Sequence, residues 1–93
     1  MRSIDVEVRN RSGLHARPAA AFVRAASAFA STIRVKNVTL ARPATNAKSI
    51  VGVMATGAER GHLLRVTADG IDEDRAVEAL RELLARLDEP VRD

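Results

Sequence analysis

The order of apolar and polar residues along the chain predicts a mixture of strands and helices. Apolar residues alternate with polar ones over residues 2–9, which is typical of a strand with one buried face. Over residues 16–30 they recur every three or four positions, which is typical of a helix with one apolar side. The two periods predict strands at 2–9, 32–36, 38–40 and 62–68, and helices at 16–30, 46–55 and 73–87.

Capping and breaking residues sharpen several of these boundaries. Asn46 is expected to cap the second helix, because its side-chain oxygen can accept the amide N–H of Ser49. Asp72 is expected to cap the last helix and Pro90 to stop it. Residues 41–45 are expected to form a loop, because their proline cannot donate to a central ladder.

The seven elements follow the order β-α-β-β-α-β-α, which is the split β-α-β arrangement with one added helix. Right-handed crossovers would place the helices on one face of a four-stranded antiparallel sheet, with the other face largely in water. The predicted fold class is therefore α+β. A chain of 93 residues supports one small core, so we expect a single domain over residues 1–93.

Composition excludes several classes of function. The chain has no cysteine and only two histidines, without the spacing of a metal site, so we expect no metal and no cofactor. It has no apolar run of secretory or membrane-spanning length, so we expect a cytoplasmic protein without membrane insertion. The net charge is only +3, and Trp and Tyr are absent, which disfavours nucleic acid as a partner. An acidic protein surface suits this modest positive charge better.

The most specific chemistry lies in the heptapeptide Gly-Leu-His-Ala-Arg-Pro-Ala at residues 13–19. Gly13 can adopt a positive φ and turn the chain, while Pro18 is tolerated only in the first turn of a helix. A helix must therefore begin close to His15. Its unpaired N–H groups and the guanidinium of Arg17 would hold a negatively charged group beside the imidazole. We interpret His15 as a histidine that accepts a phosphoryl group.

This heptapeptide and the later segment Asn46–Met54 closely resemble the HPr family, the phosphocarriers of the bacterial phosphoenolpyruvate-dependent phosphotransferase system for sugar transport. The resemblance covers the chain from Ile4 to Leu84. It implies an open-faced β-sandwich with three helices on a four-stranded antiparallel sheet. It also implies a carrier, not an enzyme, that accepts a phosphoryl group from enzyme I on Nδ1 of His15 and passes it to a sugar-specific enzyme IIA.

The resemblance also assigns roles around His15. Arg17 would pair with the phosphate, and Ser12 and the amides of Ala16 and Arg17 would donate further hydrogen bonds. In some members a regulatory kinase phosphorylates the serine at the position of Ser49. The implied docking surface for partner proteins consists of Arg24, Ala47, Ile50, Val51 and Met54.

The chain also departs from the family pattern at three places. Ala47 and Val51 replace larger apolar residues often found in the docking surface, which reduces the apolar contact and leaves open which partner docks. The segment before Asn46 is longer than is usual in the family, so we expect the third strand to be displaced or bulged there. Residues 88–93 extend past the last helix, and we expect them to form a frayed tail.

Simpler structural roles are open for three of the site residues, and a structural role is expected for the second histidine. Ser49 is sufficiently explained as a helix cap, Arg24 as a solvated residue, and Met54 as part of the core. His62 lies at the start of a strand without a partner motif, so a structural role is expected for it. We expect the chain to be a monomer.

Two other functions compete with the sugar phosphocarrier. One is an HPr-like regulatory module of a nitrogen- or dihydroxyacetone-linked phosphorelay, which signals through phosphorylation of His15 or Ser49. The other is a small RNA-binding domain, which the missing aromatic residues disfavour.

Overall fold

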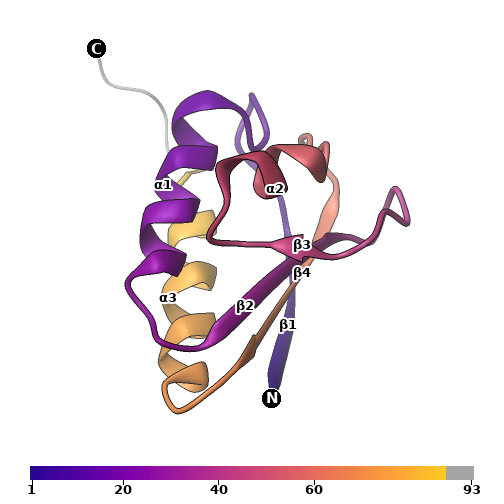
Figure 1. Ribbon diagram of the computed structural model, residues 1–93. Helices are drawn as coiled ribbons and strands as arrows, with labels where there is room; N and C mark the ends of the chain where they lie inside the picture. The colour runs from indigo at the N-terminus through magenta and orange to yellow at the C-terminus, as the bar shows by residue number, and fades with distance from the viewer. Residues whose placement is uncertain (88–93) are drawn as a thin grey trace.

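A four-stranded antiparallel sheet forms one layer of the molecule and helices form the other (Figure 1). The structure is a computed structural model and describes residues 1–87. The strands are β1 (Arg2–Glu7), β2 (Thr32–Asn37), β3 (Thr45–Asn46) and β4 (Leu63–Asp69), side by side in the order β1-β4-β2-β3. The helices are α1 (Ala16–Ser27), α2 (Ile50–Ala55) and α3 (Glu73–Arg86). The predicted α+β class and open-faced architecture are confirmed.

One face of the sheet is apolar and carries the core. Ile4 on β1 lies opposite Val66 on β4, and Val66 lies opposite Val35 on β2, so an apolar row crosses three strands. All three side chains are buried. The apolar sides of α1 and α3 cover this face, with the fully buried Phe22 and Leu80 among their contributions. Burying such large side chains is the main favourable term in folding a domain of this size.

The other face of the sheet is polar and open to water. Arg65 on β4 donates to the carboxylate of Asp5 on β1 at 2.8 and 3.1 Å. The hydrogen bond from Arg65 lowers the pKa of Asp5 below its usual value. The hydroxyls of Ser3 and Thr67 lie 3.1 Å apart in the neighbouring row. No helix is needed on this side, because these groups satisfy one another across the strands.

Helix α1 is shorter than the apolar pattern predicts. Helix α1 ends at Ser27, because Ala28 and Phe29 donate their amide N–H groups three residues back, to Ala25 and Ala26. This tightening ends the α-helix while Phe29 still packs against the core.

The third strand lies later in the chain than predicted, and the expectation of a strand at 38–40 is wrong. The amide N–H of Leu40 donates to the side-chain oxygen of Asn37 at 3.0 Å, and that of Arg42 donates to the Asn37 carbonyl at 3.2 Å. These bonds fold the segment into turns in place of a ladder. Strand β3 forms at Thr45–Asn46 and pairs with β2. The strand is thus displaced, which is one of the two outcomes expected for the longer segment.

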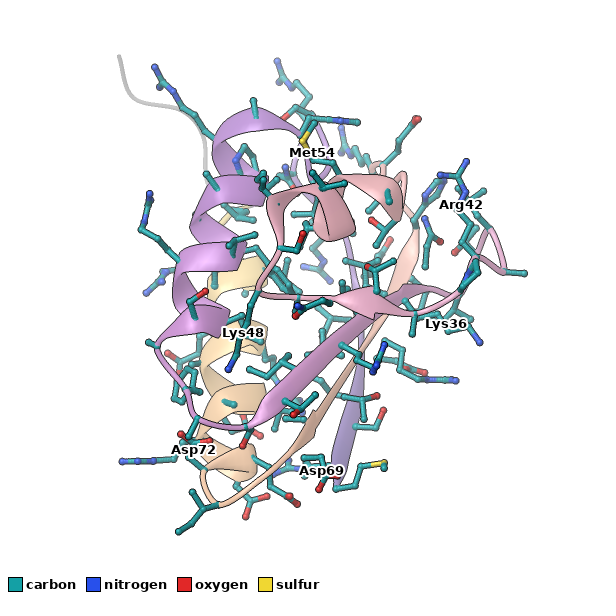
Figure 2. All side chains as sticks on the ribbon, in the orientation of Figure 1. Lys36, Arg42, Lys48, Met54, Asp69 and Asp72 are labelled. Carbon is teal, nitrogen blue, oxygen red and sulfur yellow. The ribbon has the colours of Figure 1, made fainter. Side chains whose placement is uncertain are left out.

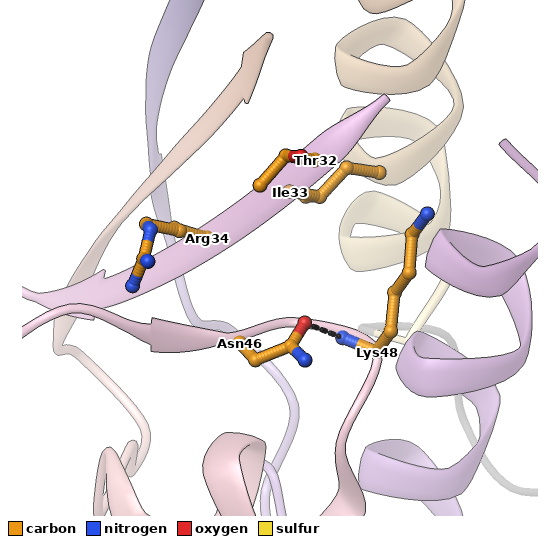
Figure 3. A pocket seen from close by; sticks show the side chains of 5 residues that line it. All are labelled: Thr32, Ile33, Arg34, Asn46 and Lys48. Carbon is orange, nitrogen blue, oxygen red and sulfur yellow. Dashed lines mark hydrogen bonds between the residues drawn. The ribbon is translucent and has the colours of Figure 1, made fainter. Parts of the chain in front are cut away.

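Ser49 caps α2, and the expectation that Asn46 would do so is wrong. The Ser49 hydroxyl accepts the amide N–H of Gly52 at 3.1 Å. Asn46 belongs to β3, and its side-chain oxygen accepts the amide N–H of Lys48 at 2.9 Å (Figure 3). The helix therefore begins at Ile50, after a short turn that the Asn46 side chain stabilises.

Asp72 precedes α3, but its side chain does not cap that helix as predicted. Its carboxylate instead accepts the N–H of Ala30 at 2.8 Å, the N–H of Ser31 at 3.0 Å and the Ser31 hydroxyl at 2.5 Å. At the N-terminal end of α3, the side chain of Glu73 instead accepts the backbone N–H of Gly70 at 3.1 Å. Asp72 therefore ties the turn between α1 and β2 to the start of α3.

We expect the stability of the protein to depend on Asp72 in acid. The hydrogen bond from the Ser31 hydroxyl, followed by that from the Ala30 N–H, lowers the pKa of Asp72 from 3.8 to about 2. A lowered pKa in the folded state means that this contribution is complete above pH 3.8 and is lost as the pH falls toward about 2. Urea unfolding over this pH range should show a shallower loss of stability for Asp72→Asn than for the wild type.

A matched control for this prediction is Asp69→Asn at the same end of the molecule (Figure 2). The Asp69 carboxylate lies 3.8 Å from the amino terminus, at the limit of a salt bridge, and is largely exposed. Asp69→Asn should keep the wild-type acid dependence. An Asp72→Asn protein with an unchanged acid dependence would contradict the role given to Asp72.

In the part of the chain that the structure describes, no helix is long and apolar enough to cross a bilayer. The predicted tail at residues 88–93, and Pro90 as the residue that stops the last helix, lie outside residues 1–87.

Candidate functional site

The turn before α1 packs against the backbone of a segment that lies far away in the sequence. Gly13 has φ +65°, as its predicted role in the turn requires, and the N–H of Leu14 donates to the carbonyl of Ala58 at 3.0 Å. A Cβ at Gly13 would lie only 2.3 Å from the Ala58 oxygen. The side chain of Leu14 is buried. These contacts leave the next residue, His15, on the surface.

His15 lies at the N-cap position of α1, with φ −117° and ψ 154°. It is exposed, and its side chain makes no capping hydrogen bond. Ala16, which follows, has φ +47°, a conformation that costs an alanine some strain. The imidazole is therefore not used to cap the helix.

The groups around His15 suit an anion. The first turn of α1 contains no acidic residue, so no carboxylate opposes the positive end of the helix dipole. Ala16 and Arg17 supply backbone N–H groups there, whereas Pro18 has none. Ser12 and Arg17 are exposed nearby in the sequence. The structure is thus compatible with the predicted phosphate contacts at Ser12, Ala16 and Arg17.

Arg17 and Arg24 lie on one exposed side of α1, as their spacing predicts. Within residues 1–87, neither takes part in a salt bridge. A shallow depression of about 370 Å³ runs beside them. It is lined by Arg17, Pro18, Ala20, Ala21, Arg24 and Leu87. Within the described residues, the depression thus combines two guanidinium groups that form no salt bridge with four apolar side chains.

Helix α2 presents exposed apolar side chains at the same end of the molecule as the start of α1 (Figures 1 and 2). The exposed fractions are 42% for Ile50, 74% for Val51 and 44% for Met54. Met54 therefore belongs to the surface more than to the core. Their exposure agrees with the docking role expected for these three residues.

Ala47 does not belong to this surface, and the expectation that its side chain contacts a partner is wrong. Ala47 is fully buried, and its N–H donates to the carbonyl of Ile33 at 2.9 Å. This bond continues the β2–β3 pairing by one residue and turns the side chain into the core. Of the residues expected to dock from this segment, Ile50, Val51 and Met54 therefore remain exposed.

His62 stabilises the turn before β4, in agreement with the structural role predicted for it. Its Nδ1 accepts the N–H of Glu59 at 3.1 Å and lies 3.1 Å from the side-chain nitrogen of the buried Asn37. Both neighbours are donors, so the proton of the neutral ring lies on Nε2. This turn carries Ala58, on which the loop before His15 rests.

A second depression, of about 240 Å³, lies between β2 and β3 (Figure 3). Its basic side chains do not converge, because the Lys48 ammonium reaches away toward α1 and donates to the Phe29 carbonyl at 2.7 Å, while Arg34 points to the other side. In the described part of the chain, no three His, Cys, Asp or Glu side chains gather as they would around a metal ion.

Two residues that support the site are not among those predicted from the sequence. Ala58 contributes only its carbonyl oxygen, which no side-chain pattern reveals. Asn10 is buried, and its side-chain nitrogen donates to the Gly13 carbonyl at 2.5 Å. An asparagine three residues before a glycine is a recognisable turn signal, and it could have indicated Asn10.

Known proteins match this chain over most of its length. Residues 2–86 match the family model described as PTS HPr component phosphorylation site. Phosphocarrier protein HPr of Haemophilus influenzae is 42% identical over 88 residues, which are 95% of this chain and 100% of that protein. The crystal structure of HPr-C-His from Thermoanaerobacter tengcongensis has a TM-score of 0.90 at 40% identity and covers 98% of this chain and 100% of that chain.

Longer proteins also contain a similar segment. The multiphosphoryl transfer protein of Haemophilus influenzae is 40% identical over 78 residues, which are 84% of this chain but 16% of that protein. For the protein of that name in Escherichia coli O157:H7, the identity is 39%, and 22% of its length is covered. The chain therefore spans less than a quarter of the length of these relatives.

The fold and the matches place the chain in the phosphocarrier class of proteins. More particularly, the chain belongs to the HPr family of phosphocarriers of the phosphotransferase system.

Proposed function

We propose that the chain carries a phosphoryl group on His15 from phosphorylated enzyme I to a sugar-specific enzyme IIA. The observation that carries this proposal is the exposed imidazole at the start of α1, free of any capping bond. Unpaired N–H groups of the helix and the guanidinium of Arg17 lie beside it in the chain, and both favour a phosphate there.

In the transfer step, the lone pair of Nδ1 on the neutral imidazole forms a bond to phosphorus, while the ring proton stays on Nε2. The bond between phosphorus and the donor atom breaks, and its electron pair returns to the donor. The second transfer reverses these roles, with His15 as the leaving group. Phosphoryl transfer depends mainly on positioning and charge neutralisation, which Arg17 and the amides of Ala16 and Arg17 supply.

The open surface around His15 explains how one small chain can serve two enzymes in turn. Ile50, Val51 and Met54 offer apolar contact, and Arg17 and Arg24 offer charge to an acidic partner. Each enzyme would cover this surface, exclude water and add the remaining catalytic groups. The chain therefore stores the phosphoryl group, and the choice of recipient depends on the partner.

The experiment that tests the pathway uses purified phosphorylated chain and two kinds of acceptor. Transfer to a sugar-specific enzyme IIA should be complete within the assay, and transfer to the IIA-type acceptors of nitrogen- or dihydroxyacetone-linked relays should be at least about tenfold slower. Rapid transfer only to the latter acceptors would contradict the sugar pathway and favour the regulatory module. Failure to accept phosphate from enzyme I would contradict the sugar pathway.

A second candidate function is regulation through Ser49. The Ser49 hydroxyl lies at the N-terminal end of α2, directly before the exposed Ile50 and Val51. A phosphate there would be favoured by the helix end and would add a charge of about −2 beside the docking surface. Repulsion of an acidic partner is the expected consequence. A regulatory HPr kinase would be the third partner.

For Ser49→Ala we expect two results. Incubation with the kinase and ATP should label the wild type with an acid-stable phosphate and leave the variant unlabelled. The lost cap should also lower the free energy of unfolding by about 1 kcal/mol, measured by urea denaturation. If the wild type stays unlabelled while Ser49→Ala still loses stability, Ser49 acts only as a helix cap.

A further inference from the structure

Asn10 closes a clamp around Gly13, two residues before His15. The backbone carbonyl of Asn10 accepts the N–H of Gly13 at 3.2 Å, and the Asn10 side-chain nitrogen donates to the Gly13 carbonyl at 2.5 Å. One residue therefore binds both polar backbone groups of Gly13. Asn10 is only 7% exposed, so water does not compete strongly for these bonds.

The clamp also orients the peptide groups that lead into α1. The bond from the Asn10 side chain is buried, so the Gly13 carbonyl points into the interior and away from the exposed side of the loop. The next N–H, that of Leu14, is held by the Ala58 carbonyl at 3.0 Å. Three successive backbone groups are thus bound before the chain reaches His15.

The side-chain oxygen of Asn10 differs from its nitrogen in its hydrogen bonding. Its Oδ1 is buried and, within residues 1–87, has no hydrogen-bond partner. A buried acceptor without a protein partner contributes no hydrogen bond to stability. The part of the amide that acts in the structure is its N–H donor, and its target is the loop that carries His15.

We propose that Asn10 is a positioning residue for His15, which rests on the carrier function proposed above. By holding the Gly13 carbonyl inward, Asn10 keeps a negative dipole away from the bound phosphate and fixes the direction in which the imidazole leaves the backbone. Reactions of this kind are sensitive to displacements of about 1 Å in the reacting group.

The test is Asn10→Asp, which keeps the shape of the side chain but replaces the N–H donor with an oxygen. At neutral pH the carboxylate would repel the Gly13 carbonyl and open the clamp. The maximal rate of His15 phosphorylation by enzyme I should fall about tenfold or more, while the KM for enzyme I stays within about twofold, because the docking residues are untouched. Hydrogen exchange at the Leu14 amide should accelerate at least about tenfold.

Asp72→Ala is the matched control, since it loses hydrogen bonds at the opposite end of the molecule. It should lower the unfolding temperature and leave the maximal rate and the Leu14 exchange rate unchanged. If Asn10→Asp does not fold, Asn10→Ala removes the same donor without adding a charge. A variant at position 10 that loses stability but keeps the wild-type maximal rate and Leu14 exchange would overturn the proposal.

The two proposals fail in different ways. A wild-type chain that takes no phosphate from enzyme I would contradict the carrier function. The same variants would then be compared by Leu14 exchange, and by labelling of His15 with phosphoramidate, a small donor that needs no protein partner. Unchanged exchange and labelling in Asn10→Asp would overturn the positioning role by themselves.

Discussion

Replacing His15 with alanine should abolish phosphate uptake completely. With phosphoenolpyruvate and enzyme I, the wild type should acquire a phosphate that is labile in acid and stable in alkali, as expected for a phosphorylated imidazole. His15→Ala should acquire none, because no other exposed side chain in the heptapeptide has a nucleophile of this kind. The free energy of unfolding should change by no more than about 0.5 kcal/mol, since the imidazole is exposed and caps nothing.

The matched control is the other histidine. His62→Ala removes the acceptor of the Glu59 N–H and should lower the free energy of unfolding by about 1–3 kcal/mol. It should still take up one phosphate while folded. Labelling that persists in His15→Ala and disappears in His62→Ala would show that the carrier residue has been assigned wrongly.

The largest loss of stability near the site is expected for Gly13→Ala. Its φ of +65° strains any residue with a Cβ, and the added carbon would lie 2.3 Å from the Ala58 oxygen and 2.8 Å from the Glu59 Cα. Both obstacles are backbone atoms, so the loop itself must move. We expect the free energy of unfolding to fall by about 3 kcal/mol, measured by urea denaturation, and His15 phosphorylation to slow in parallel.

Substitutions at two other glycines distinguish the cost of backbone strain from the cost of a steric clash. Gly57 has nearly the same φ, +64°, but a Cβ there meets only the flexible end of the Arg42 side chain. Gly61, at φ +91°, has no atom within 4 Å of the added carbon. Gly57→Ala and Gly61→Ala should each cost about 1 kcal/mol and leave phosphorylation unchanged. Equal losses at all three positions would mean that the Ala58 contact contributes nothing.

The site is predictable from the sequence because its constraints are local. Gly13, His15 and Pro18 each restrict the same short stretch of backbone, and together they define a turn and a helix start. The structure places them as expected. The alternation along β1 and β4 likewise depends on neighbours in the chain, and both strands form within one or two residues of their predicted bounds.

What the sequence does not reveal depends on contacts between distant residues. Asn37 bonds to the turn that follows it and to His62, and this network replaces the predicted third strand. Asp72 finds three donors at Ala30 and Ser31, which no local capping rule includes. Ala47 is buried because its N–H extends the pairing with β2. In each case a nonlocal partner outweighs the local preference.

The hydrogen bond from the Leu14 N–H to the Ala58 carbonyl connects the two halves of the chain, one residue before His15. During synthesis, the heptapeptide emerges long before Ala58, so the Leu14 N–H has no partner until the chain has been made as far as the turn before β4. Competence to accept phosphate should therefore appear only when most of the chain is assembled. The modification would then report completed folding, and a truncated chain that carries the whole heptapeptide would not draw phosphate from the relay.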